Sequence, residues 1–133
     1  MTLLQAADVP RWLHRFEHFH DSVITACRVS SSTGETTLVV TILAPDTESL
    51  VSGWSEVTLK FARISSLDLQ VDPNTVWFVL SELYVVAEGD LIGFQFEELG
   101  DAPATMNDLV SSSLHVVASH VQWGWKPAPD KGR

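Results

Sequence analysis

Cysteine and long apolar runs are scarce in this sequence. Cys27 is the one cysteine among 133 residues, so no disulfide can form within the chain and the fold does not depend on an oxidising compartment. No stretch approaches the roughly 18 apolar residues that a membrane-spanning helix needs. The first ten residues also lack the positive start and apolar core of a secretory signal. We therefore expect a cytoplasmic protein, in which Cys27 is a packed thiol rather than a nucleophile.

Positive charge is missing from most of the second half of the chain. The sequence has 17 acidic and 8 basic side chains and a net charge of −9, yet no Lys or Arg lies between Arg63 and Lys126. The rest of the chain has as many basic as acidic residues, so all the excess charge belongs to this interval. It contains nine carboxylates: Asp68, Asp72, Glu82, Glu88, Asp90, Glu97, Glu98, Asp101 and Asp108.

A surface of this kind repels nucleic acid and anionic membranes, because both are bound through Lys and Arg. It attracts basic proteins and speeds their encounter. The sequence therefore predicts a protein-interaction domain with a basic protein partner, and solubility alone is the alternative explanation of the acidity. We expect Glu97, Glu98 and Asp101, near the end of a predicted hairpin, to contact that partner.

Motifs for catalysis and cofactor binding are also missing. No glycine-rich loop is followed by Lys, as a phosphate-binding loop would be, and Ser111, Ser112 and Ser113 have no G-x-S-x-G elbow around them. We predict no catalytic residue, no cofactor and no enzymatic activity.

The apolar pattern predicts one mainly β (α+β) domain over residues 1–126, followed by a flexible tail at 127–133. Asp8 and Pro10 indicate a helix start, and a short helix is expected over 9–18. About six strands should form a mostly antiparallel, curled sheet that resembles a barrel or a sandwich. Residues 23–29 and 36–43 read as a hairpin in which Val23, Thr25, Cys27 and Val29 share one face.

Three further segments complete the predicted sheet. Residues 54–71 alternate, but the apolar phase slips by one near Ile64, which indicates a bulge, a bend or two strands. Residues 75–88 fit either a helical stripe or, as we prefer, part of a second hairpin with 91–96. A helical turn is possible near 105–110, and 114–125 is the last strand.

Three histidines gather near the start of the chain. His14 to His18 spells H-x-x-E-H, which on a helix places two zinc ligands on one face, with Glu17 as a base. Glu82 or Glu88 would have to supply a third ligand. A simpler site would use His14, His18 and His20, with Asp21, and the alternative function is then a small ligand- or metal-binding β-barrel. We favour a third interpretation, in which these are polar positions that hydrogen-bond backbone groups where the helix meets the first strand.

Trp123 and Trp125 are two residues apart on the last predicted strand, so they share a face. Such a pair covers one end of a core or anchors a partner, and both alternatives stay open. We include both residues among the candidate partner contacts.

One short segment carries a family resemblance. Phe19-His20-Asp21-Ser22 leads into a predicted hairpin, which is followed by Val57-Thr58-Leu59-Lys60-Phe61 and a late strand that ends in Trp. This pattern resembles small bacterial β-rich proteins with an F-H-D-[SA] entry into the first strand, some of which are assigned as immunity proteins of polymorphic toxin systems. The resemblance implies a domain that binds and neutralises a toxin. It carries over no catalytic residue, and the motif itself is expected to be structural.

Overall fold

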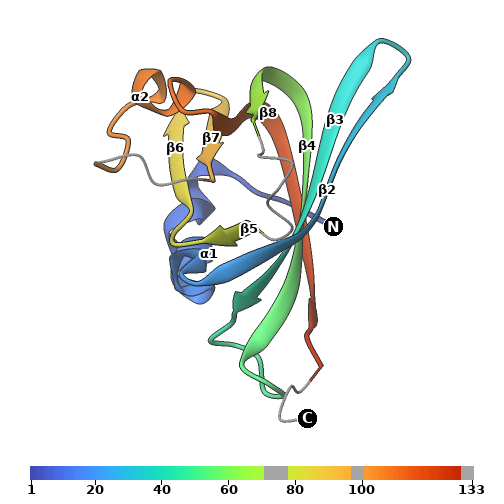
Figure 1. Cartoon of the computed structure of the whole chain (residues 1–133), viewed down its shortest axis with the longest axis vertical. Coiled ribbons are helices and arrows are strands. Elements are labelled where there is room, and N and C mark those ends of the chain that lie inside the picture. Colours follow the sequence, from blue (N-terminus) through green and yellow to red (C-terminus); the bar gives the residue numbers. More distant parts are fainter. Residues whose placement is uncertain (71–77, 97–100, 130–133) are drawn as a thin grey trace.

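The protein folds into one antiparallel sheet that curls into a half-barrel (Figure 1). The structure, a computed structural model, describes residues 1–70, 78–96 and 101–129. The strand order is β5-β2-β3-β4-β8-β7-β6, with β1 paired to β8. This confirms the predicted mainly β class. The strands are β1 Thr2–Leu3, β2 Ser22–Ser32, β3 Glu35–Pro45, β4 Trp54–Leu69, β5 Phe78–Leu80, β6 Tyr84–Glu88, β7 Leu91–Gln95 and β8 Leu114–Pro127.

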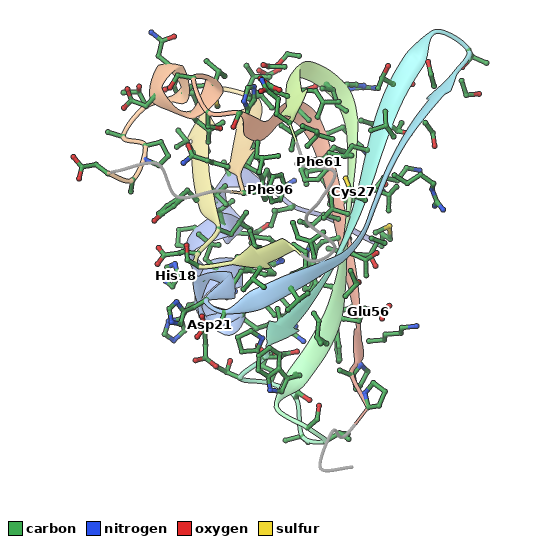
Figure 2. The ribbon with its side chains drawn as sticks, viewed as in Figure 1. His18, Asp21, Cys27, Glu56, Phe61 and Phe96 are labelled. Carbon is green, nitrogen blue, oxygen red and sulfur yellow. The ribbon has the colours of Figure 1, made fainter. Side chains whose placement is uncertain are left out.

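The core lies inside the curl of the sheet. Alternate residues of β3 and β4 point inward and are buried, and Figure 2 shows Phe61 and Phe96 within the curl. The helix α1 (Val9–Arg15) packs against this core through Trp12, whose ring contacts Phe19 and Phe94. Burying a large apolar side chain contributes about 1.5–3 kcal/mol, so these aromatic residues fix α1 on the sheet.

The first helix is shorter than predicted. It starts with Pro10 in its first turn, as expected, but it ends at Arg15 rather than at residue 18. A 3-10 turn, η2 (Glu17–Phe19), follows, and all three of its residues have positive φ, between 52° and 58°. Three successive left-handed residues cannot continue a right-handed helix, so the chain turns here toward β2.

The first predicted hairpin is confirmed, with β2 and β3 joined through a turn at Thr33 and Gly34. Its phase is different, however. A register shift between Ile24 and Ala26 places Ile24 opposite Ile42, so Ile24 rather than Val23 shares the inner face with Cys27. A bulge of this kind adds one residue and reverses the alternation.

Cys27 is exposed, and the prediction of a packed thiol was wrong. Among the described strands, β2 beyond Ile24 pairs only with β3, and this part of the hairpin extends from the body of the sheet (Figure 1). Desolvation by its neighbours still raises the pKa of the Cys27 thiol. A raised pKa keeps the thiol protonated near neutral pH, which opposes a role as nucleophile.

The phase slip in the third segment is a bulge within one strand. β4 runs unbroken from Trp54 to Leu69, and its pairing with β8 shifts between Ile64 and Ser66. Arg63, just before the shift, has a φ of 54°. Leu67 and Leu69 then return to the core face, as the sequence predicted.

The segment predicted as either helix or hairpin forms two strands. β5 pairs with the start of β2, and β6 forms the expected hairpin with β7. The helical alternative is therefore wrong for 78–88, whereas 75–77 lie outside the described residues. The predicted turn near 105–110 is α2 (Met106–Val110).

The last strand ends later than predicted. β8 continues to Pro127, and the next residue, Ala128, is buried and donates its N–H to the Trp54 carbonyl at 3.0 Å. The beginning of the predicted tail is therefore part of the fold, and 130–133 lie outside the described residues. Within the described residues, no helix is long and apolar enough to cross a membrane.

Candidate functional site

The Phe19-His20-Asp21-Ser22 motif holds the connection between β5 and β6. Phe19 and Ser22 are fully buried. His20 Nδ1 lies 2.8 Å from the Ser81 carbonyl oxygen, which can only accept, so this nitrogen carries a proton. Directly beside it, the Leu83 N–H donates to the His18 carbonyl at 3.0 Å. The motif thus joins the turn before β2 to the crossing between two strands, which is a structural role.

The histidine cluster does not have the geometry of the H-x-x-E-H signature. His14 lies in α1 but His18 lies in η2, so the two are not related by one helical turn. His14, His18 and His20 are exposed, and Figure 2 shows His18 and Asp21 at the surface beside α1. His20 Nε2 lies 3.3 Å from the Asp21 carboxylate.

The two proposed third ligands do not complete a metal site. Glu88 accepts a hydrogen bond from the N–H of Met106, at the start of α2. Glu82 lies in the connection between β5 and β6, whose Leu83 N–H donates to the His18 carbonyl. Across residues 1–70, 78–96 and 101–129, no three His, Cys, Asp or Glu side chains lie close enough together to hold a metal ion.

Trp123 and Trp125 share a face, as predicted, and one guanidinium touches both rings. Arg15 lies 5.7 Å from the centroid of Trp123 and 4.5 Å from that of Trp125. Trp123 also packs edge-to-face against Phe16 and Trp12, at centroid distances of 5.8 and 6.3 Å. Trp123 is therefore partly buried against the core, whereas Trp125 is 47% exposed and stays accessible.

The guanidinium of Arg15 is held by a buried carboxylate that the sequence analysis did not single out. Arg15 Nε and one terminal nitrogen donate to the two oxygens of Asp46 at 3.0 and 3.1 Å. Asp46 also accepts from Ser55 Oγ at 2.6 Å and from the Glu48 N–H at 2.9 Å. The one sequence signal was Asp46 directly after Pro45, at a strand end, where Asp commonly binds its own backbone two residues on.

The pKa of Asp46 reflects two opposing effects. Burial disfavours the charged carboxylate and acts to raise the pKa. Hydrogen bonds from Arg15, Ser55 and Glu48, together with the positive charge of Arg15, outweigh burial, and the pKa of Asp46 is lowered. The carboxylate is therefore ionised and held in place, which suits a structural ion pair rather than proton transfer.

Five carboxylates from the acidic half of the chain lie on α2 or on segments at the same end of the molecule as α2 (Figure 1), and we call them the acidic end. Glu88 and Asp108 cap α2: Glu88 binds the Met106 N–H, and Asp108 forms a capping box with Thr105. Asp90 and Asp101 are exposed, and Asp68 lies opposite His115 in the sheet. Glu97 and Glu98 lie outside the described residues. The acidic end is thus Asp68, Glu88, Asp90, Asp101 and Asp108.

Basic side chains gather elsewhere on the sheet. Arg28 and Lys60 both lie opposite Val39, on either side of it, so they share one face about 10 Å apart. Lys60 also lines a shallow hollow of about 310 Å³ with Arg63 and His120. Glu35 also lines that hollow, so the basic residues Lys60 and Arg63 outnumber one carboxylate there, whereas the acidic end contains no Lys or Arg.

The structure does not unite the predicted partner contacts into one site. Asp101 lines a hollow with Gln95, which pairs with His115 near the start of β8. Eight residues of strand separate His115 from Trp123, a distance of roughly 26 Å at 3.3 Å per residue. In Figure 1, α2 and the C-terminal end of β8 lie at opposite ends of the molecule. Asp101 and the tryptophan pair therefore belong to different surfaces.

No family model, no curated protein and no solved structure matches this chain. Function is therefore to be inferred from the placement of its charges and side chains.

Proposed function

We propose that the chain is a non-enzymatic, cytoplasmic protein-binding domain that docks a basic partner at its acidic end. The supporting observation is that five carboxylates lie at the end of the molecule that carries α2, in a stretch of sequence without Lys or Arg: Asp68, Glu88, Asp90, Asp101 and Asp108. Like charges held on a folded surface produce a field that steers an oppositely charged protein into contact.

Three of these five carboxylates are already engaged and two are available. Asp68 accepts a hydrogen bond from Gln70 Nε2 at 3.1 Å. Glu88 and Asp108 hold the start of α2, so they shape the surface and contribute charge to it. Asp90 and Asp101, which both precede α2 in sequence, are exposed. A partner would meet these two most directly.

The resemblance of the Phe19-to-Ser22 segment to immunity proteins extends the proposal to the kind of partner. In this extension the basic protein is a toxin domain, which the bound chain neutralises by covering its surface. A toxin that acts on nucleic acid would carry the required positive surface, since Lys and Arg contact phosphate. The acidic end would then compete with the toxin's own substrate.

The test compares two charge-reversal pairs of equal net charge. Asp90→Lys with Asp101→Lys alters the acidic end, and Glu17→Lys with Glu35→Lys alters exposed carboxylates elsewhere. A partner is captured from the source cells with the unaltered chain, purified, and titrated onto all three proteins at 50 and 300 mM salt. We expect the acidic-end pair to lower the association rate at least tenfold and to flatten its salt dependence.

The control pair should leave the association rate within about twofold of the unaltered chain, because it changes net charge without changing the acidic end. Equal losses for both pairs, or a captured partner without a basic surface, would overturn the proposal. Co-expression then tests the toxin extension: the unaltered chain should relieve growth inhibition by the captured partner and the acidic-end pair should not.

A further inference from the structure

A hollow beside α2 has the chemistry of a receptor for one positively charged side chain. It encloses about 360 Å³ between the end of β7 and the loop before α2. Two carboxylates, Asp101 and Asp108, line it, and Ala102 and Pro103 add an apolar wall. Ser111, Ser112 and Gln95 complete the lining.

Ser112 is the unusual member of this lining. It is only 3% exposed, and its Oγ has no hydrogen-bond partner among the described residues. Its backbone is fully engaged: the N–H donates to the Leu109 carbonyl at 3.1 Å, and the carbonyl accepts from His115 Nδ1 at 2.8 Å. A buried hydroxyl without a partner costs free energy, about 1–3 kcal/mol, so a ligand atom that bonds to it would recover that cost.

The neighbouring His115 does not bond to the Ser112 hydroxyl. His115 Nδ1 donates to the Ser112 carbonyl at 2.8 Å, and its Nε2 lies within hydrogen-bond distance of Ser66 Oγ, at 2.8 Å. His115 is thereby satisfied on both nitrogens and does not compete for Ser112 Oγ.

The two carboxylates supply further acceptors. Asp108 receives the backbone N–H groups of Ala104 and Thr105 on Oδ2, at 3.1 and 3.3 Å, and the described residues place no hydrogen bond on Oδ1. Asp101 is exposed. The lining residues therefore include three acceptors to which the described residues donate no hydrogen bond: one oxygen of Asp108, the carboxylate of Asp101, and the hydroxyl of Ser112, which is itself closed to solvent.

We infer that this hollow receives the ammonium group of a lysine from the basic partner, an inference that rests on the proposed function. An ammonium is compact and has three rotatable donors, which match three separate acceptors. A guanidinium is planar and prefers the two oxygens of one carboxylate, which Asp101 could supply, but that pairing would leave the Ser112 hydroxyl without a donor. The aliphatic stem of lysine would lie along Ala102 and Pro103.

The experiment uses an acetylated tetralysine peptide as the probe, titrated into the ¹⁵N-labelled full chain and followed by NMR. Ser112→Ala is compared with Ser31→Ala, an exposed serine in β2, and Asp101→Asn is compared with Asp90→Asn. We expect Ser112→Ala to weaken tetralysine binding about tenfold, because the lost bond is to a charged donor. Asp101→Asn should weaken it at least fivefold more than Asp90→Asn, and tetraarginine should bind less tightly than tetralysine.

Ser112→Ala should fold at least as well as the unaltered chain, since it removes a buried hydroxyl that has no partner, and its NMR spectrum checks this. Equal affinities for Ser112→Ala and Ser31→Ala, or equal effects of Asp101→Asn and Asp90→Asn, would overturn the lysine receptor and indicate diffuse attraction. No tetralysine binding at all would also overturn it, while the proposed function would stand if the captured partner still required the acidic end.

Discussion

Arg15 and Asp46, which are 31 residues apart in sequence, form a bidentate ion pair with donor–acceptor distances of 3.0 and 3.1 Å. The pair ties the end of α1 to the turn after β3, and it is nearly dry: the side chain of Arg15 is 13% exposed and that of Asp46 is 0% exposed. Trp125 lies over the same guanidinium, so one ion pair organises the end of the molecule opposite α2.

Removing the buried half of this pair should be strongly destabilising. We expect Asp46→Ala to lower the free energy of unfolding by about 3 kcal/mol, because it leaves the Arg15 charge without its buried partner. Glu48→Ala is the matched control: Glu48 contacts the same Arg15 at 3.5 Å but is 66% exposed, and its loss should cost under about 1 kcal/mol. Urea denaturation of both variants measures the difference, and equal losses would contradict a dry ion pair.

The same pair should make stability depend on pH. Because the pKa of folded Asp46 lies below its ordinary value of 3.8, the unfolded chain takes up the proton first on acidification. The stabilisation from ionised Asp46 is therefore complete above pH 3.8 and is lost as the pH falls through the lower, folded value. Between pH 6 and pH 3, the urea midpoint of unfolding should therefore decrease more for the unaltered chain than for Asp46→Asn. A parallel fall in both would show that other carboxylates cause the acid sensitivity.

The regular parts of the fold were predictable because they depend on local alternation. Both hairpins, the bulged strand β4 and the last strand follow from apolar residues at every second position and from turn residues between them. Even the slip near Ile64 was visible, because a bulge shifts the phase of the apolar residues themselves.

Other features were not predictable because they depend on contacts that are distant in sequence. The bulge between Ile24 and Ala26 lies among Val, Ile, Thr and Ala, which fit either phase. The end of α1 at Arg15 is set by the docking of Phe19 in the core and by the contact between His18 and Leu83, 65 residues later. The Arg15–Asp46 pair and the unpartnered Ser112 hydroxyl likewise become visible only in three dimensions.

Within the Phe19-to-Ser22 motif, the buried ring of Phe19 should contribute more to stability than the surface hydrogen bond of His20. Phe19→Ala removes a fully buried ring and should cost about 3–5 kcal/mol. His20→Ala removes a hydrogen bond at the surface, from Nδ1 to the Ser81 carbonyl, and should cost about 1 kcal/mol or less. Thermal unfolding followed by circular dichroism measures both. If His20→Ala proved the more destabilising, the histidine would have a role beyond holding the β5–β6 connection.

The packing of α2 on β7 should be sensitive to a single methyl group. A Cβ added at Gly93 would lie 2.7 Å from Met106 Sδ and 3.0 Å from Leu109 Cδ2. Met106 can rotate away, but Leu109 is fully buried, so we expect Gly93→Ala to cost about 1–3 kcal/mol and to displace α2.

Gly124→Ala is the control for that substitution, since its Cβ would meet only Met1, at an ordinary 3.6 Å. Alanine in a strand loses less backbone entropy than glycine, so this variant should be neutral or slightly more stable. Because α2 carries Asp108, displacement of the helix by Gly93→Ala should also weaken tetralysine binding, whereas Gly124→Ala should not change it. NMR titration measures the affinity of the folded form of each variant for tetralysine. If the α2 resonances of Gly93→Ala shifted but its affinity stayed unchanged, the position of α2 would not matter for lysine binding.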